Sequence, residues 1–255
     1  MKVHHVRNAT MVIESGDNFI LVDPMLSKKG LLGPPLTYFR FKPLRNPTVD
    51  LPHNAMTIIQ KTTHCLITHL HPDHLDEPAE VFLKEKNIPV ICSITDEAKL
   101  RKKGLNVTQT VEYWKESEFL GGKIQGIPAA HGYGIAAKIA GPVMGFFIEL
   151  PNEKTFYISA DTIYTDDVHK VLTELKPDIA VVACGRAQFD IFPPFLMLME
   201  DILKFMRNAP NKVLANHLEA ANHCPTKRSD LRKEVSTNGL THKVFIPIDG
   251  ESITY

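Results

Sequence analysis

Residues 68–74 read THLHPDH, a stretch that brings three histidines and an aspartate together directly after a short apolar run. A tight turn of the form HxHxDH directs alternate side chains to different positions. Two neighbouring cations of borderline softness need such a divided supply of imidazole and carboxylate ligands. Ordinary core or surface histidines are the alternative, but four unpaired polar groups beside a buried strand would be costly without a metal. The stretch therefore predicts a metal site that includes His69, His71, Asp73 and His74.

The ends of other predicted strands carry the same kinds of side chain. The apolar runs KIQGIPAA, TFYISA and KVLAN lead to His131, Asp161 and His217, and the run FILV leads to Asp23. Strand ends and the loops after them are where rigid scaffolds display chemical groups. Two cations held close together repel each other, and the Asp161 carboxylate with a water-derived hydroxide could offset that repulsion. Six further histidines share no such regularity, and we expect surface or interior roles for them: His4, His5, His53, His64, His169 and His242.

Short apolar runs rich in Val, Ile and Phe recur along the chain, bounded by Gly, Pro, Asn or Asp as strands are. Early runs follow one another as hairpins do, and later ones are separated by segments with helical spacing. That mixture predicts layered sheets covered by helices. Thr95 before two acidic residues and Pro194 in a first turn are N-terminal helix signals. The expected helices are Pro78–Lys86, Thr95–Lys103, Thr165–Leu175, Pro194–Arg207 and Thr226–Glu234.

The segment from Pro24 to Pro52 differs from the rest of the chain. It is rich in proline, contains Gly30 and Gly33, and carries several aliphatic and aromatic residues. A connection of this length inside a compact domain is usually functional or disordered, and its apolar content argues against disorder. We interpret residues 24–52 as a flap over a pocket. A packing insertion or a dimer contact is the alternative.

The composition of the chain argues against nucleic-acid binding and membrane insertion. Lys plus Arg and Asp plus Glu both number 29, so the formal net charge is zero, whereas a nucleic-acid binder normally carries a basic excess. The sequence has no uninterrupted apolar stretch of the length that a membrane span needs, and no signal-peptide pattern at its start. Its scattered cysteines fit free thiols in a reducing compartment. We therefore expect a cytoplasmic protein that binds neither nucleic acid nor membranes.

The chain resembles the metallo-β-lactamase superfamily of metal-dependent hydrolases nearly end to end, from NATMVIESGDNFILVDPML through THLHPDH, AAHG, SADT and ANH to PIDGESI. The resemblance implies one domain over residues 1–255: an αββα sandwich, two mixed sheets face to face flanked by helices, with a dinuclear site along one edge. The branch that contains L-ascorbate-6-phosphate lactonase looks most similar. Asp23 matches an aspartate of the family that ends an early strand and accepts a hydrogen bond from the outer N–H of a metal-binding histidine. Alternatively, Asp23 simply starts the turn with Pro24. The resemblance assigns the first metal to His69, His71 and His131, the second to Asp73, His74 and His217, and the bridging position to Asp161.

The resemblance implies a hydrolase in which water bound between two divalent ions attacks a lactone, ester or phosphoester of a small molecule. Asp73, both ligand and hydrogen-bond acceptor, would orient the water and take up a proton. Zinc and manganese suit the predicted ligands, and iron would also fit. The alternatives are a nucleic-acid phosphodiesterase of the same fold and a metal-binding protein without hydrolytic activity.

Four residues near the predicted ligands are candidates for the substrate pocket. Arg186 could meet an anionic substrate or form a surface salt bridge. His223 could line the pocket or serve in packing or helix capping. Tyr133 and Tyr164 follow predicted ligands closely and could form pocket walls. The apolar segment Phe189–Met199 could be core or a subunit interface, so a homo-oligomer stays open.

Overall fold

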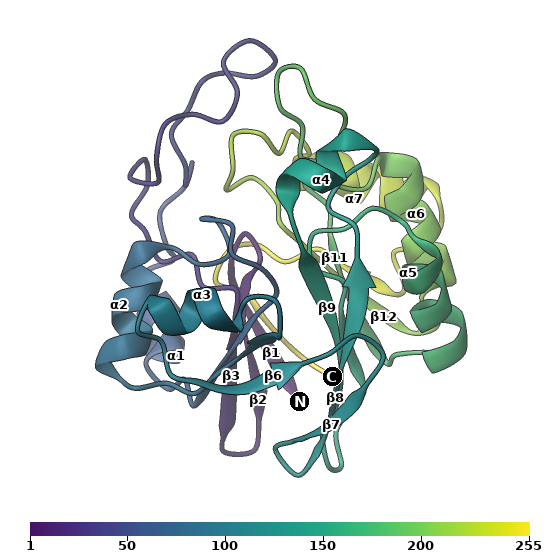
Figure 1. Cartoon of the computed structure of the whole chain (residues 1–255). Helices are drawn as coiled ribbons and strands as arrows, with labels where there is room; N and C mark the ends of the chain where they lie inside the picture. Colours follow the sequence, from purple (N-terminus) through teal and green to yellow (C-terminus); the bar gives the residue numbers. More distant parts are fainter.

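Two mixed β-sheets of seven strands each lie face to face in the computed structural model, which describes all 255 residues (Figure 1). The strand order of the first sheet is β14-β1-β2-β3-β4-β5-β6, and that of the second is β13-β12-β11-β10-β9-β8-β7. The first sheet contains β1 (Lys2–Arg7), β2 (Thr10–Ser15), β3 (Asn18–Val22), β4 (His64–Ile67), β5 (Val90–Ser93), β6 (Val107–Val111) and β14 (Ser252–Thr254). The second contains β7 (Glu116–Phe119), β8 (Gly122–Ala129), β9 (Val143–Glu149), β10 (Phe156–Ile158), β11 (Ile179–Ala183), β12 (Lys212–Asn216) and β13 (Val244–Phe245).

Helices cover the outer face of each sheet (Figure 1). On the first sheet lie α1 (Ala55–Ile59), α2 (Glu77–Glu85) and α3 (Glu97–Lys102). On the second lie α5 (Asp166–Lys170), which continues as a π-helical turn over Val171–Leu175, α6 (Met199–Asn208) and α7 (Arg228–Thr237). The short α4 (Ile135–Ala140) follows β8. No helix is long and apolar enough to cross a membrane.

The apolar core forms three layers that match this arrangement. One cluster joins the facing sides of the two sheets and includes Phe146, Ile13 and Leu66. A second joins the first sheet to α1, α2 and α3, and a third joins the second sheet to α5, α6 and α7. Because each sheet buries both faces, its central strands, such as β3, β9 and β11, consist of almost continuous apolar runs. The αββα sandwich implied by the resemblance is confirmed.

Strand direction brings the chemically important strand ends to one edge. β3 and β4 are parallel, and so are β10, β11 and β12. β8 runs antiparallel to β9, which runs antiparallel to β10, so β8 and β10 point the same way. The carboxyl ends of these strands therefore lie together, each followed by a predicted site residue.

Three details of the predicted helices are wrong. The helix predicted from Pro194 begins at Met199, because residues 185–198 form a loop that packs against the edge of the sandwich. Thr95 does not cap α3, whose N-cap residue is Asp96. The prediction also omitted α1 and α4, which are too short to show a helical period.

The segment 24–52 arches over the edge where these strands end and is tied down along its length (Figure 1). The fully buried Arg7 guanidinium donates hydrogen bonds to the carbonyl oxygens of Met25, Ser27 and Val49. Thr48 donates through its hydroxyl to the carbonyl oxygen of Glu219, at 2.5 Å. We call residues 24–52 the flap.

Candidate metal centre

The first group of predicted ligands comes from two strand ends. His69 and His71 follow β4, and His131 follows β8. The Nδ1 atom of His71 lies 3.1 Å from Nε2 of His69 and 3.2 Å from Nε2 of His131. These three ring nitrogens therefore converge on one point, as the ligands of one metal ion do.

The second group lies beside the first. The Nε2 atoms of His74 and His217 are 3.2 Å apart, and Nε2 of His217 is 3.3 Å from a carboxylate oxygen of Asp73. His217 directly follows β12 and has a positive φ of 55°, an uncommon backbone conformation that turns the chain at the sheet edge. All three side chains are buried.

Asp161 lies between the two groups. Its Oδ2 atom is 3.3 Å from Nε2 of His74, 3.4 Å from Nε2 of His217 and 3.5 Å from Nε2 of His131. Its Oδ1 atom is buried and has no hydrogen-bond partner. A buried carboxylate oxygen without a donor is costly, and a cation would satisfy it.

Hydrogen bonds on the outer side of the imidazoles determine which ring nitrogen faces the centre. Nδ1 of His131 lies 2.8 Å from the carbonyl oxygen of Phe195, and Nε2 of His71 lies 3.0 Å from that of Ala140. Nδ1 of His74 lies 2.9 Å from a carboxylate oxygen of Asp23. The outer nitrogens of His131 and His71 therefore carry the proton of a neutral ring, and their inner nitrogens present lone pairs. Lone pairs that face one another at about 3 Å repel, and a shared cation removes that repulsion. The residues present fit metal ions.

Electrostatics divide the histidines into two kinds. Burial lowers the pKa of His131 to about 4, so this imidazole is neutral near pH 7. Burial also opposes charge on His74, but the Asp161 and Asp23 carboxylates outweigh it and raise the pKa of His74 to about 10. The pKa of His217 is likewise raised, against burial, by Asp161 and by neighbouring side chains. A bound divalent ion would replace these protons as the partner of the carboxylates.

Asp23 holds the second group from behind, as its position after β3 suggested. Its two oxygens accept hydrogen bonds from the backbone N–H of Thr68 at 2.8 Å, the Thr68 hydroxyl at 2.7 Å, and His74. The same hydroxyl is 2.9 Å from Nδ1 of His69. One buried carboxylate therefore orients ligands of both groups, directly or through Thr68.

Sequence reasoning missed two further residues that hold His217. The carboxamide of Asn8 donates to the carbonyl oxygen of Asp73 at 3.2 Å and lies 3.5 Å from Nε2 of His217. The Cys224 thiol lies 3.5 Å from the other ring nitrogen of His217. Asn8 belongs to the quoted stretch NAT, so the sequence did contain a signal for it. Cys224 offered none.

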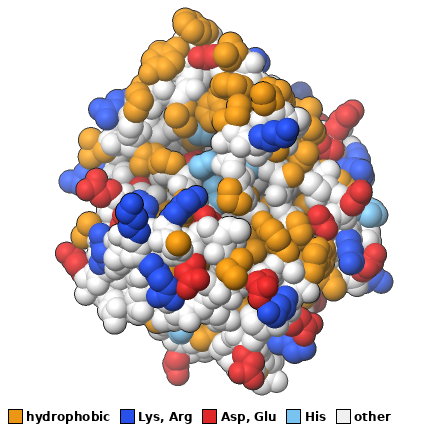
Figure 2. All heavy atoms as spheres, viewed as in Figure 1, with side chains coloured by type: hydrophobic (Ala, Val, Ile, Leu, Met, Phe, Trp, Pro, Cys, Tyr) orange, Lys and Arg blue, Asp and Glu red, His pale blue; other side chains and the backbone are white.

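A cavity of about 560 Å³, which we call the metal cavity, opens directly above the ligands. Figure 2 shows pale-blue histidine side chains at the base of a hollow with hydrophobic side chains around it. Its walls are mainly apolar and contain no lysine or arginine. The flap contributes Leu36 and Phe39, and α4 contributes Ile139 and Ala140. The metal centre contributes His71, Pro72, Asp73, His131 and Asp161. The remaining lining residues are His223 and, from the loop 185–198, Ala187, Phe189, Asp190, Ile191, Phe192 and Phe195.

Reciprocal hydrogen bonds, which we call the latch, join the flap to the loop 185–198. The Asp190 carboxylate accepts hydrogen bonds from the backbone N–H groups of Tyr38, Phe39 and Arg40 and from the Thr37 hydroxyl. The Arg40 guanidinium donates in return to the carbonyl oxygens of Phe189 and Asp190. The latch fixes one wall of the metal cavity against the other, although Phe39 and Ile191 at its rim are 91% and 85% exposed.

The structure places only one of the four pocket candidates at the metal cavity. His223 lines it and stacks on Phe189, with ring centroids 4.9 Å apart. Arg186 is half-buried outside it, and its Nε atom has no partner. The Tyr133 hydroxyl donates to Asp201, and the Tyr164 hydroxyl is bonded to His169 and Asn208, so neither tyrosine forms a cavity wall.

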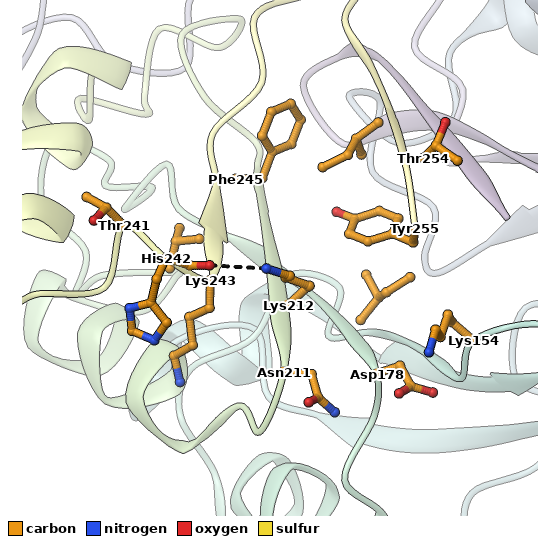
Figure 3. A pocket seen from close by; sticks show the side chains of 13 residues that line it. Lys154, Asp178, Asn211, Lys212, Thr241, His242, Lys243, Phe245, Thr254 and Tyr255 are labelled. Carbon is orange, nitrogen blue, oxygen red and sulfur yellow. Dashed lines mark hydrogen bonds between the residues drawn. The ribbon is translucent and has the colours of Figure 1, made fainter.

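A different cavity lies at the opposite ends of the strands (Figure 3). Lys212 at the start of β12 and Asp178 just before β11 line it, together with Lys243 and Tyr255. The Lys212 and Lys243 ammonium groups already donate to backbone carbonyl oxygens, and Asp178 already accepts from Thr155. None of the predicted ligands lines this cavity, so it is separate from the candidate metal centre.

Known proteins resemble this chain in sequence and in fold. A family model described as Beta-lactamase superfamily domain matches residues 18–215. UPF0173 protein YddR of Bacillus subtilis is 30% identical over 263 residues, which cover 100% of both chains. A UPF0173 metal-dependent hydrolase of Methylacidiphilum infernorum is 26% identical over 186 residues, 72% of this chain and 73% of its own. The crystal structure of isothiocyanate hydrolase from Delia radicum gut bacteria superimposes with a TM-score of 0.89 at 30% identity, covering 100% of this chain and 99% of that one.

The fold and the site thus define a member of the β-lactamase superfamily. Within it, the chain belongs to the UPF0173 family of metal-dependent hydrolases. The superfamily resemblance is confirmed, whereas the similarity to the ascorbate-6-phosphate lactonase branch stays a prediction.

Proposed function

We propose that the protein hydrolyses a small, uncharged and mainly apolar molecule at an electrophilic carbon, with two divalent ions at the centre. The observation that carries this proposal is an apolar cavity without lysine or arginine that opens onto converging imidazoles and carboxylates. The two ions would offset negative charge at the reacting centre itself, but an anionic group farther along the cavity, as in a phosphoester or a nucleic acid, would meet no cationic side chain. We therefore favour an ester, a lactone or an isothiocyanate over a phosphoester. The isothiocyanate hydrolase that resembles this chain supports a carbon-centred substrate.

Each group of ligands has a role in the proposed mechanism. His69, His71 and His131 would hold one ion. Asp73, His74 and His217 would hold the other, and the Asp161 carboxylate, which lies between the two groups, would serve both ions. When bound, such ions supply Lewis acidity and lower the pKa of a coordinated water towards neutrality. Zinc or manganese suits this mixture of imidazole and carboxylate ligands, and iron is the third choice.

The protein's own groups would then guide the proton and the substrate. Asp73 is buried but lines the metal cavity, so its carboxylate can orient the attacking water and accept its proton. The same carboxyl group would return the proton to the departing oxygen or nitrogen. The apolar walls would hold the substrate's hydrocarbon portion and exclude competing water. In an ester, the acyl carbon gains the water oxygen and its bond to the alcohol oxygen breaks.

Hydrolysis assays on the metal-loaded protein test this proposal. Protein stripped of metal and reconstituted with Zn²⁺ or Mn²⁺ would be assayed with a phenyl ester, a γ-lactone, benzyl isothiocyanate and bis-p-nitrophenyl phosphate. We expect turnover of at least one of the first three, and a loss of about 10²-fold or more in the Asp73→Asn variant. Turnover of the phosphodiester alone would refute the proposed substrate class. Turnover that does not depend on added metal would refute the mechanism.

A further inference from the structure

A second cavity lies on the other side of Asp73, beneath the first half of the flap. Its volume is about 830 Å³, and we call it the flap cavity. Leu26, Leu31 and Leu32 of the flap form one side, and Pro78 at the start of α2 forms part of the other. The flap cavity and the metal cavity share three lining residues: Leu36, Pro72 and Asp73.

The shared residues show that both cavities open next to the metal centre. Asp73 is the only one of the predicted ligands that lines both. A substrate atom held beside the Asp73 carboxylate would therefore stand where both cavities begin. Groups bonded to that atom could extend in two directions, one into each cavity.

The flap cavity is suited to hydrocarbon rather than to charge. Two of its polar groups already have partners: the Ser27 N–H donates to Asp76 at 2.6 Å, and Oδ1 of Asn46 accepts from the N–H of Asn222 at 2.8 Å. Apart from Asp73 at its junction with the metal cavity, its charged lining residues are Lys28 and Glu77, and both are exposed. Leucine and proline side chains make up most of the remaining wall, which favours an apolar occupant.

The wall of the flap cavity is also fixed in place. The Arg7 guanidinium holds the carbonyl oxygens of Met25 and Ser27, and Leu32 donates its N–H to the carbonyl oxygen of Asn46 at 2.7 Å. Farther along the flap, the latch through Asp190 holds the backbone of residues 38–40. A cavity with anchored walls is preformed, so a ligand need not order the flap on binding.

We propose that the flap cavity is a second substrate subsite, and that the substrate carries apolar groups on both sides of the reacting carbon. This inference rests on the proposed function and narrows it. An ester or thioester with an apolar acyl group and an apolar leaving group would fill both cavities. An isothiocyanate, with a single hydrocarbon arm, would fill only one.

Two matched hydroxamates test the second subsite by equilibrium binding. Octanohydroxamic acid has one hydrocarbon arm, and N-butyl-octanohydroxamic acid adds a second arm on the other side of the same metal-binding group. We expect the two-armed probe to bind the zinc-loaded protein about tenfold or more tightly, since each fully buried methylene contributes about fourfold in affinity. Equal affinities of the two probes would overturn the proposal.

Tryptophan reporters locate the arms. Leu31 is 63% exposed and lines the flap cavity, and Ile139 is 54% exposed and lines the metal cavity, so Leu31→Trp and Ile139→Trp should fold normally. Trp114, the only natural tryptophan, packs against the α5–α7 layer and can be replaced by Phe in both variants. The one-armed probe should shift the emission of one reporter, and the two-armed probe should shift both. A Leu31→Trp emission that neither probe alters would overturn the proposal.

The outcomes separate the subsite from the proposed function. If the two-armed probe binds more tightly but no ester is hydrolysed, the subsite stands and the reaction is wrong. If esters are hydrolysed but the second arm changes neither affinity nor emission, the reaction stands and the subsite is wrong.

Discussion

Replacing Asp23 by asparagine should weaken metal binding without removing a predicted ligand. The Asp23 carboxylate accepts hydrogen bonds from Thr68 and from Nδ1 of His74, and it is only 2% exposed. Asparagine has nearly the same shape but only one acceptor oxygen. If that oxygen stays on Thr68, the amide NH₂ faces Nδ1 of His74. The histidine must then place its proton on Nε2, the nitrogen that faces Asp161 and His217.

The expected size of the effect follows from the contact that is lost. A hydrogen bond to a charged group is worth about 1.5–3 kcal/mol in a protein. Since Asp23 is buried, solvent screening does not reduce that value. Each 1.4 kcal/mol corresponds to a factor of ten, so the affinity for the metal at His74 should fall about 10- to 100-fold. Measured effects of removing groups behind metal-binding histidines span the same range.

A competition titration with a chromophoric chelator measures this change. Metal-stripped wild-type and Asp23→Asn proteins would be titrated with Zn²⁺, and the two binding steps fitted separately. Asp249→Asn is the matched control, because Asp249 is a largely buried carboxylate that pairs with Arg228 and His5 and contacts no predicted ligand. The control should lose stability but keep its zinc affinity. Wild-type affinity in both steps for Asp23→Asn would refute the reasoning.

Three further predictions concern protons, the latch and the core. At pH 7.5 zinc binding should release about two protons per chain, because the pKa of His74 is raised to about 10 and that of His217 is raised as well. The number of protons released should diminish as the pH rises towards 10. Calorimetry of zinc binding in buffers of different ionisation enthalpy measures this number. If no proton is released, the assigned charges are wrong. Asp190→Ala should raise KM for apolar substrates several-fold with little change in kcat, because it frees the flap from the cavity wall. Steady-state kinetics measures both constants, and an unchanged KM would count against the latch. Phe146→Ala should lower the free energy of unfolding by about 3–5 kcal/mol, since Phe146 is fully buried between the sheets; urea denaturation measures this, and a loss below about 1 kcal/mol would contradict the layered core.

The position of the candidate ligands was predictable because it depends on strand direction. His69, His131, Asp161 and His217 each come within a few residues of a strand's carboxyl end, and those strands run the same way within their sheets. Apolar runs mark buried strands in a sequence. The residue types that follow them could therefore be placed at one edge from the sequence alone.

Directions of side chains in loops were not predictable in this way. Tyr133 and Tyr164 are close to ligands in sequence, yet their hydroxyl groups bond to Asp201 and to Asn208 in the helical layer. Proximity along a loop does not fix which way a side chain points. Pro194 offered a valid helix-start signal, but α6 begins only at Met199: the carbonyl oxygens of Pro194 and Phe195 bond to Tyr133 and His131 instead of to a following helical turn.

The contacts that build the cavities join distant parts of the chain. The latch connects Asp190 to residues about 150 positions earlier, and the buried Arg7 connects β1 to the flap. Nothing local distinguishes either residue from an ordinary surface charge, because charged residues are rarely buried. The flap was therefore predictable as a segment, but its anchoring and the second cavity beneath it were not.

The number of metal ions per chain tests the central claim most directly. Elemental analysis of protein saturated with Zn²⁺ and freed of excess metal should give two ions per chain for the wild type. The His217→Ala variant should retain about one, since the group around His71 is intact. Wild-type protein that holds no metal, or a His217→Ala variant that still holds two ions as tightly as the wild type, would contradict the account.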